Sequence, residues 1–273
     1  MTADVINKDL KTSLRRLRLS PILATLADRL ALARKKRMPH QDFLLLLLQD
    51  EVSRRDGNAV ARRAQRARLD SESTFEAWDE TAEVSYDETL LAELKTGRFV
   101  EACLHVGIYG PVGVGKTFLA QALGHVACEA GRSVSFLRHD QLLKTLRHAR
   151  LDNSYEAELL KLLAVDLLIV DDFALDAMDA QESRDTYEVL VERHRAGSVI
   201  LTSNRGPDEW IATFADPIRA QAAIDRFTSR SFDLVLEGES YRSRLKPSVE
   251  GLQSGQIAKP PTKSKKRSRQ RAN

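Results

Sequence analysis

Residues 110–117 read Gly-Pro-Val-Gly-Val-Gly-Lys-Thr and match the pattern G-x-x-x-x-G-K-[ST] in full. An apolar run at residues 104–109 precedes this loop and predicts a buried strand, and a helical pattern of apolar residues follows from Thr117. The motif thus lies between a strand and a helix, which is the context in which a glycine-rich loop wraps a phosphate group. A phosphate-binding loop in an α/β fold is therefore predicted, and a glycine-rich turn of similar sequence is the alternative.

The residue types of this loop predict what each part does. Glycines allow backbone N–H groups to approach a phosphate closely, and the helix that follows points its positive end at the same anion. Lys116 is expected to reach the β- and γ-phosphates of a nucleoside triphosphate, and the Thr117 hydroxyl is expected to ligate Mg²⁺. The predicted nucleotide-binding residues are Gly110, Pro111, Val112, Gly113, Val114, Gly115, Lys116, Thr117 and Phe118.

A second apolar stretch, residues 167–170, ends in two acidic residues, Asp171 and Asp172. Ligands of open α/β sheets bind at the carboxyl edge of the strands, where this Walker B segment delivers its carboxylates. Asp171 is predicted to hold Mg²⁺ directly or through water, and Asp172 to act as a base or to orient water. The alternative is a loop that begins with helix-capping residues. Because Asp is one methylene shorter than Glu, hydrolysis is expected to be slow without a partner.

Two later residues complete the predicted catalytic set. Asn204 follows an apolar strand at residues 198–202 and is expected to hydrogen-bond the attacking water or the γ-phosphate; the alternative is a capping residue in a turn. Arg226 lies late in the core, and we expect it to act as an arginine finger on the site of a neighbouring subunit. A surface ion pair between Asp225 and Arg226 is the alternative.

Charge is unevenly distributed along the chain, although the net charge is only +3. Residues 1–70 contain 16 Lys and Arg against 8 Asp and Glu, and residues 251–273 contain seven basic residues and no acidic ones. Residues 71–250 are acidic overall. Basic ends indicate a polyanionic partner such as a nucleic acid, while solvated helix faces and a loose tail are the alternative.

Signals for export and membrane insertion are not found. The first residues lack a basic region followed by an apolar stretch, so no signal peptide is expected. The longest apolar run, residues 43–48, is too short to cross a bilayer. Cys103 and Cys128 have no metal-ligand spacing and are expected to be inert packing groups. We expect a cytoplasmic protein without a membrane partner.

The pattern of the chain predicts four regions. Residues 1–70 have the periodicity of about three helices, the third beginning near His40, with a candidate interruption at residues 57–58. Residues 71–102 form a linker and docking segment, in which Phe75 and Trp78 are expected to dock the linker on the core rather than bind a ligand. Residues 103–247 alternate between strands and helices, which predicts a parallel sheet covered on both faces. Residues 248–273 are expected to be a disordered basic tail. Strands are expected at residues 103–109, 133–137, 166–171, 198–202 and 232–236, and helices at 116–130, 140–149, 155–163, 182–195 and 217–226.

Taken together, these segments resemble the IstB family of transposition helper ATPases, which belongs to the AAA+ superfamily and is close to DnaC-type helicase loaders and DnaA-type initiators. The similarity covers about residues 8–247. The matching stretches are residues 110–117, 167–173 (LLIVDDF), 188–195 (EVLVERHR), 200–205 (ILTSNR), 209–210, 223–227 (AIDRF) and 237–242 (EGESYR). The resemblance implies a P-loop AAA+ core whose five parallel strands lie in the order 5-1-4-3-2, preceded by a small all-helical domain and without a C-terminal lid. Asp172 departs from the Glu that many AAA+ proteins have at this position.

The resemblance also implies partners. Members of the family bind ATP, self-assemble, bind double-stranded DNA largely independently of sequence, and stimulate a DDE-type transposase. Such DNA binding is expected to use Lys and Arg contacts with phosphates. An ordinary solvated helix face is the alternative for each basic residue. The candidate DNA-binding residues are Arg15, Arg16, Lys35, Lys36, Lys144, Arg147 and Arg150.

Three other functions remain open on the sequence. A DnaC-like helicase loader would share the core but would use the N-terminal domain to bind a replicative helicase. A small-molecule P-loop kinase would need an acceptor pocket and a mobile lid, and would leave Asn204 and Arg226 without a role. A DNA-binding scaffold would hold nucleotide without hydrolysing it.

Overall fold

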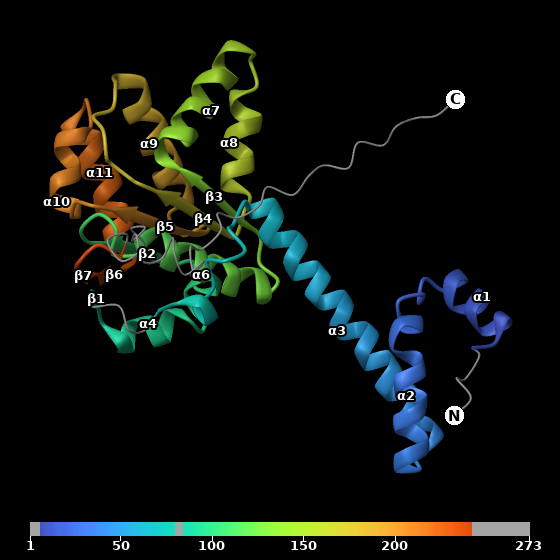
Figure 1. The fold of residues 1–273 in the computed structure, drawn as a ribbon. Coiled ribbons are helices and arrows are strands. Elements are labelled where there is room, and N and C mark those ends of the chain that lie inside the picture. Colours follow the sequence, from blue (N-terminus) through green and yellow to red (C-terminus); the bar gives the residue numbers. More distant parts are fainter. Residues whose placement is uncertain (1–5, 80–83, 242–273) are drawn as a thin grey trace, which may run out of the picture.

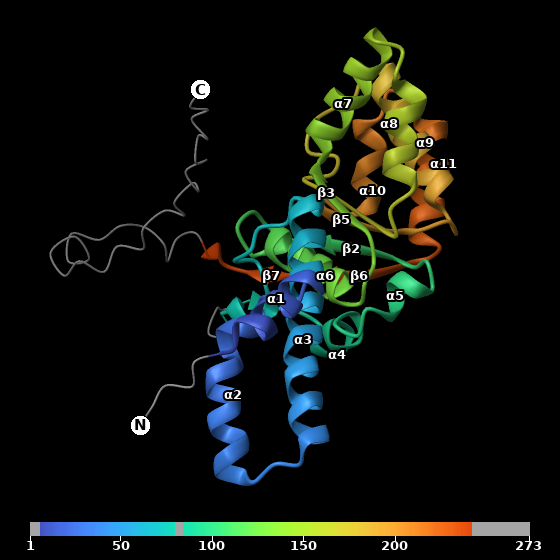
Figure 2. The same ribbon diagram turned by 90° about the vertical axis from the view of Figure 1, so that its right-hand side faces the viewer.

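The computed structural model describes residues 6–79 and 84–241, and begins with three helices that form an arm. The helices are α1 (Lys8–Arg16), α2 (Ile22–Lys36) and α3 (His40–Ala67). The arm stands away from the rest of the protein, and α3 runs from the turn after α2 back to the core (Figures 1 and 2). The predicted basic tail at residues 248–273 and the predicted absence of a lid both concern residues outside those described.

Helix α3 is continuous over 28 residues, so the predicted interruption at residues 57–58 is wrong. A glycine within a helix costs only about 1 kcal/mol relative to alanine, and packing at both ends offsets this cost. Near its start, Leu47 is buried with Ile22 and Leu26 of α2. Near its end, Ala64 and Ala67 are buried in the hydrophobic cluster of the core. The arm is therefore fixed to the core through one unbroken helix.

Five parallel strands form the central sheet: β2 (His105–Tyr109), β3 (Val134–Arg138), β4 (Leu167–Asp171), β5 (Ser198–Ser203) and β6 (Ser231–Val235). Their order is β3-β4-β5-β2-β6. Numbered within the core alone, this is 5-1-4-3-2 read from β6, so the predicted order is confirmed. The order places the ends of β2, β4 and β5 side by side, at the edge of the sheet where the predicted nucleotide site lies.

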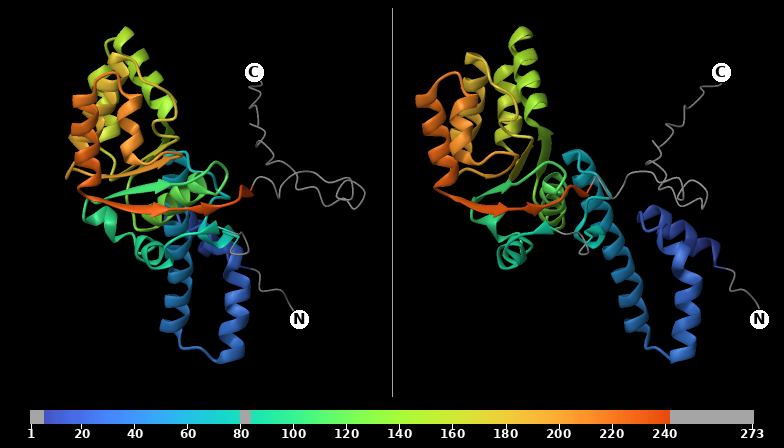
Figure 3. Two further views of the ribbon diagram at one scale, coloured as in Figure 1. Left: turned by 90° about the vertical axis from the view of Figure 1, so that its left-hand side faces the viewer. Right: turned by 60° about the vertical axis from the view of Figure 1, so that its left-hand side comes forward.

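Helices cover both faces of this sheet, because the strands carry apolar side chains on both sides. Leu168 and Val170 of β4 are buried against α7 (His139–Leu151), α8 (Tyr155–Leu163), α9 (Ala180–Arg193) and α11 (Pro217–Thr228). Leu167 and Ile169 of the same strand are buried against α6 (Lys116–Glu129) and the end of α3. Figure 3 shows the resulting three layers, with the sheet between the two groups of helices. In the described ranges, no helix is long and apolar enough to cross a membrane.

Short elements complete the fold and were not all predicted. The linker contains η1 (Phe75–Ala77), α4 (Glu88–Leu94) and α5 (Arg98–Glu101), and α10 (Pro207–Trp210) and η2 (Ile211–Thr213) follow β5. Two strands of two residues each, β1 (Val84–Ser85) and β7 (Glu237–Gly238), pair antiparallel. This pairing joins the linker to the segment that follows β6, and it brings both next to the phosphate-binding loop.

Arg193 is a fully buried guanidinium that fastens the edge of the sheet opposite the predicted site. It donates hydrogen bonds of 2.7–3.2 Å to five backbone carbonyl oxygens, at the end of α8 and at the starts of β4 and β5. Burial lowers its pKa to about 10. The five carbonyls are those of Leu162, Leu163, Val165, Asp166 and Ser198.

We expect Arg193→Leu to lower the free energy of unfolding by about 3 kcal/mol or more, because it leaves several buried carbonyls without a donor. Urea denaturation followed by circular dichroism measures this loss. Arg195→Leu is the matched control, since Arg195 is exposed two residues away, and it should change stability little. Equal stability of the two variants would contradict the role assigned to Arg193.

Candidate functional site

The glycine-rich loop connects the end of β2 to the start of α6, and its glycines adopt backbone angles that other residues rarely reach. Gly110, Gly113 and Gly115 have φ values of 146°, 89° and 98°. A Cβ atom on Gly110 would lie 2.2 Å from the carbonyl oxygen of Leu236, and one on Gly115 would lie 2.9 Å from the ring of Trp78. The loop is therefore held open by its backbone, with the N-terminus of α6 at its end, as a phosphate cradle requires.

Lys116 links two strand ends through its amine. Its Nζ donates hydrogen bonds to the carbonyl oxygens of Gly110 and Pro111, at 2.7 and 2.6 Å, and to Oδ1 of Asn204 at 2.6 Å. The side chain is only 6% exposed. Asn204 follows β5, so this contact brings the predicted polar residue at that strand end directly against the loop.

Asp171 lies at the end of β4 and is 4% exposed. Its Oδ1 accepts hydrogen bonds from the hydroxyls of Thr117 (2.8 Å) and Thr202 (2.5 Å). Burial raises the pKa of this carboxyl, and the two hydroxyl hydrogen bonds oppose the shift. Thr117 and Asp171, predicted separately as metal ligands, are thus adjacent, and their oxygen donors are of the type that Mg²⁺ prefers. Thr202 was not predicted, because a threonine inside an apolar strand gives no signal of its own.

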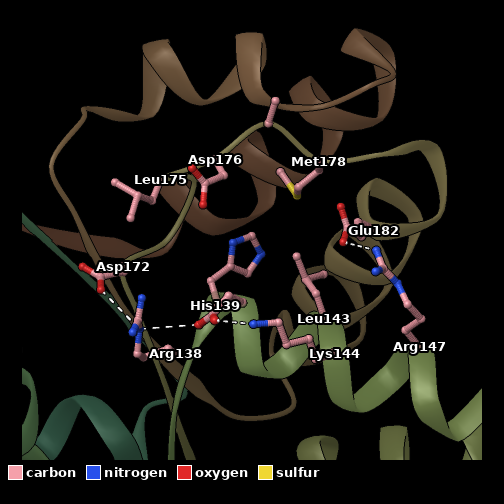
Figure 4. A pocket seen from close by; sticks show the side chains of 12 residues that line it. Arg138, His139, Leu143, Lys144, Arg147, Asp172, Leu175, Asp176, Met178 and Glu182 are labelled. Carbon is pink, nitrogen blue, oxygen red and sulfur yellow. Dashed lines mark hydrogen bonds and ion pairs between the residues drawn. The ribbon is translucent and has the colours of Figure 1, made fainter.

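Asp172 adopts a left-handed backbone conformation with φ 55°, which turns the chain sharply after β4. Its backbone N–H donates to Oγ1 of Thr202 at 3.0 Å. The Asp172 carboxylate lies 3.4 Å from Nε of Arg138 (Figure 4). The same Nε atom lies 3.4 Å from the Asp140 carboxylate. Asp172 lines both the cavity at the glycine-rich loop and the neighbouring hollow drawn in Figure 4. An ion pair therefore holds the second Walker B carboxylate at the boundary between the two.

A cavity of about 560 Å³ opens beside the loop and is partly aromatic. Trp78 lies against Phe118, with ring centroids 5.4 Å apart, and Tyr86 lies 6.2 Å from Trp78 on another side. Val84 and Tyr241 also line the cavity, and the backbone N–H of Tyr241 donates to the carbonyl of Gly113 at 3.0 Å. Trp78 thus packs on the core, as predicted for the linker, but it also lines the cavity, which the sequence analysis did not predict.

Arg226 lies on α11 and is not among the residues that line this cavity. Its Nη1 donates to the carbonyl of Ala222 on its own helix at 2.9 Å, and its side chain lines a separate hollow with Ile218 and Gln221. Its own carbonyl oxygen is 2.9 Å from Nδ1 of His194 on the segment after α9. Lys116 is the one Lys or Arg among the described residues that line the cavity beside the loop. Within one protomer, Arg226 and the phosphate loop are therefore not brought together.

The three candidate DNA-binding residues on α7 each lie beside a carboxylate. Lys144 lies 3.0 Å from Asp140 on the same helix. Arg147 pairs with Glu182 (Figure 4) and also with Asp179. Arg150 pairs with the buried Asp185 and stacks on the ring of Tyr155, with Cζ 3.7 Å from the centroid. Arg147 and Arg150 thereby tie α7 to α8 and α9. For Arg147 and Arg150 these acidic partners lie 30 or more residues away in the sequence, so helical spacing alone did not reveal them.

The N-terminal candidates occupy two separate places on the arm. Arg15 and Arg16 end α1, and Lys35 and Lys36 end α2. All four are exposed. The whole of α2 lies between the two pairs, so they do not form one cluster (Figure 2). In the described part of the chain, no group of three or more His, Cys, Asp and Glu residues is arranged to hold a metal ion.

Solved structures of AAA+ proteins share this fold. A DnaA initiator bound to AMPPCP and single-stranded DNA matches 71% of this chain with a TM-score of 0.51 and 20% identity. This chain spans 58% of the length of that DnaA chain. The crystal structure of a DnaC helicase loader matches 60% of this chain and 97% of its own, with a TM-score of 0.50 and 18% identity. Identities this low show a shared fold alone.

Sequence relatives are closer. A putative ATP-binding protein in an insertion sequence of Mycobacterium tuberculosis is 37% identical over 239 residues, which cover 87% of this chain and 95% of the relative. The putative ATP-binding protein of insertion sequence IS21 from Pseudomonas aeruginosa is 35% identical over 87% of this chain and 90% of its own. A family model described as IstB-like ATP binding protein matches residues 12–249. The chain therefore belongs to the IstB-like family of insertion-sequence ATP-binding proteins.

Proposed function

We propose that this protein is a cytoplasmic ATPase that binds ATP and Mg²⁺, assembles with copies of itself on double-stranded DNA, and assists a DDE-type transposase. The observation that carries the proposal is the meeting of three strand ends at one loop: Lys116 contacts Asn204, and Thr117 contacts Asp171. Membership of the family supports the binding of ATP, and the names of the relatives connect this family with insertion sequences.

Each residue of the site has a proposed part in hydrolysis. The loop N–H groups and the Lys116 amine would hold the β- and γ-phosphates. Thr117 and Asp171 would hold Mg²⁺, directly or through water, and the bound ion would neutralise charge on the phosphate oxygens. Asn204 and Asp172 would orient the attacking water, with Asp172 reaching the phosphate side of the cavity that it already lines. Because Asp172 is short and is paired with Arg138, we expect the isolated protomer to hydrolyse slowly.

The partly aromatic cavity beside the loop suits the nucleobase of ATP. Bases stack on aromatic side chains, and Trp78 lies on the wall of the cavity next to Gly115 and Phe118. The linker of residues 71–102 would therefore take part in nucleotide binding, between a helical domain at 1–70 and an ATPase core at 103–247.

Assembly would complete the site. Charge that develops during phosphoryl transfer is commonly stabilised by a guanidinium supplied from a neighbouring subunit. Arg226 lies away from the cavity of its own chain, which suits a role in the site of the next protomer. A helicase loader of the DnaC kind is the alternative function, and it is supported by the fold alone.

We expect Trp78→Ala to weaken ATP binding about tenfold, because one base-stacking contact is lost. Titration with ATP by calorimetry measures the change. Inorganic tripolyphosphate should bind the variant and the wild type equally, since it has no base. Phe75→Ala is the control, because Phe75 lies in the same linker but does not line the cavity. Equal loss for ATP and tripolyphosphate would show that Trp78 does not hold the base.

We expect Arg226→Ala to bind ATP like the wild type but to lose about 10³-fold in hydrolysis rate, or to lose assembly. Phosphate release and sedimentation, each with and without duplex DNA, measure these properties. In the wild type, duplex DNA should increase both the rate and the size of the assembly. Arg219→Ala on the same helix, where Arg219 lies beside Asp216, is the control. A variant at Arg226 that hydrolyses and assembles like the wild type would rule out the finger.

A further inference from the structure

The second half of α3 has two opposite sides. One side packs on the core: Ala64 and Ala67 are buried, and Arg63 donates to the carbonyl of Cys128 at the end of α6 at 3.1 Å. The other side lines a shallow hollow of about 480 Å³. The spacing of its residues covers about a third of the helix circumference over three turns. The residues that line the hollow are Arg54, Arg55, Asn58, Ala61, Arg62 and Gln65.

This exposed side carries charge of nearly one sign. Between residues 53 and 68 the exposed charged residues are five arginines and a single acidic residue, Asp56. A merely solvated face usually intersperses both signs. The basic residues on this part of α3 are all arginines. The planar, weakly hydrated guanidinium of arginine binds phosphate with two hydrogen bonds. The five arginines are Arg54, Arg55, Arg62, Arg66 and Arg68.

Neighbouring groups leave this side positive. Arg54 and Arg55 both contact Glu51 at 2.8 Å, and these two guanidinium groups share that one carboxylate. Both arginines remain substantially exposed, at 41% and 53% of their side chains. In the described part of the chain, Arg62 and Arg66 form no ion pair with an acidic residue. One Nη of Arg55 also donates to the carbonyl of Arg18 at 3.1 Å, so the basic end of α1 lies beside this side of α3.

We infer that the side of α3 formed by Arg54, Arg55, Arg62 and Arg66 binds the phosphate backbone of double-stranded DNA. The inference rests on the proposed function and adds the surface that would carry the DNA contact. A rigid helix held at both ends keeps these arginines in fixed positions along about 18 Å, which suits a regular row of phosphates. Contacts with phosphates alone do not distinguish one base from another, so this surface suits DNA binding that is largely independent of sequence.

The position of α3 also connects this surface with the nucleotide cavity. The chain leaves the helix at Arg68 and reaches the cavity at Trp78. On the way, the backbone N–H of Asp70 donates to the Gln121 side chain on α6 at 2.7 Å, and Nε2 of His125 on the same helix is 2.9 Å from the Asp70 carbonyl. Helix α6 begins with Lys116 and Thr117. DNA on α3 and nucleotide on the loop would thus act on the two ends of one short linker.

The test replaces Arg62 and Arg66 together by glutamine in the full chain, since both are exposed and glutamine keeps the helix propensity. Binding of a fluorescent duplex is measured at several salt concentrations with Mg²⁺ and a non-hydrolysable ATP analogue. Log affinity falls with log salt, and each lost phosphate contact makes this fall less steep by about 0.9. The magnitude of the slope should therefore be about 2 smaller for the double variant, and its affinity should be about tenfold lower or more. The double variant with lysine at both positions should recover the slope.

The matched control is the double variant Arg98→Gln, Arg132→Gln, which removes the same charge from solvent-accessible residues paired with Glu93 and Glu101. It should keep the wild-type slope, and both glutamine variants should bind ATP normally. A glutamine variant at 62 and 66 that behaves like this control, while the wild type binds duplex DNA, overturns the surface but leaves the proposed function intact. A lower affinity with an unchanged slope also overturns it, because phosphate contacts are then not lost. A wild type that binds ATP but no duplex DNA overturns both.

Discussion

The geometry of this site depends on the hydrogen bonds of the Lys116 amine. The amine lies within hydrogen-bond distance of two carbonyls at the end of β2 and of the Asn204 side chain after β5. One residue further along, Thr117 contacts Asp171 at the end of β4, and Thr202 of β5 contacts the same carboxylate oxygen. These contacts exist only because β5 lies between β2 and β4 in the sheet. The strand order thereby gathers groups that are 88 residues apart in sequence.

Short sequence patterns were enough to predict much of the core fold and of the candidate site. The glycine-rich loop, the acidic end of β4 and the alternation of strands and helices follow from short spacings, and the strand order followed from the family resemblance. Contacts between distant segments gave no local signal. The residues that pair with Arg147 and Arg150 are the N-cap of α9, Asp179, and two residues within that helix, Glu182 and Asp185. The glycine at 57 suggested a break that tertiary packing at both ends of α3 overrides. The place of Trp78 in the cavity comes from its packing against Gly115 and Phe118, which lie far from it in the sequence and gave no local signal.

The architecture separates two tasks and keeps them connected. The sheet edge presents the loop, the carboxylates and the amide that suit a triphosphate, whereas the arm presents arginines that suit a polyanion. The linker between them contacts α6 at Asp70 and the cavity at Trp78. Arg226 lines a hollow on α11 rather than this cavity. Under the proposed function, one protomer would supply the binding groups and the next would supply the guanidinium. On this account, nucleotide state, assembly and DNA binding depend on one another.

Mixing two inactive variants tests the shared site most directly. Lys116→Ala should lose ATP binding but keep Arg226, while Arg226→Ala should bind ATP but lack the finger. In assemblies built at random from equal amounts of the two, about a quarter of the head-to-tail interfaces would join an intact loop to an intact Arg226. The account predicts that phosphate release by the mixture clearly exceeds the sum of the separate variants, at equal total protein and with duplex DNA present. A mixture that hydrolyses no faster than that sum would contradict a site shared between protomers.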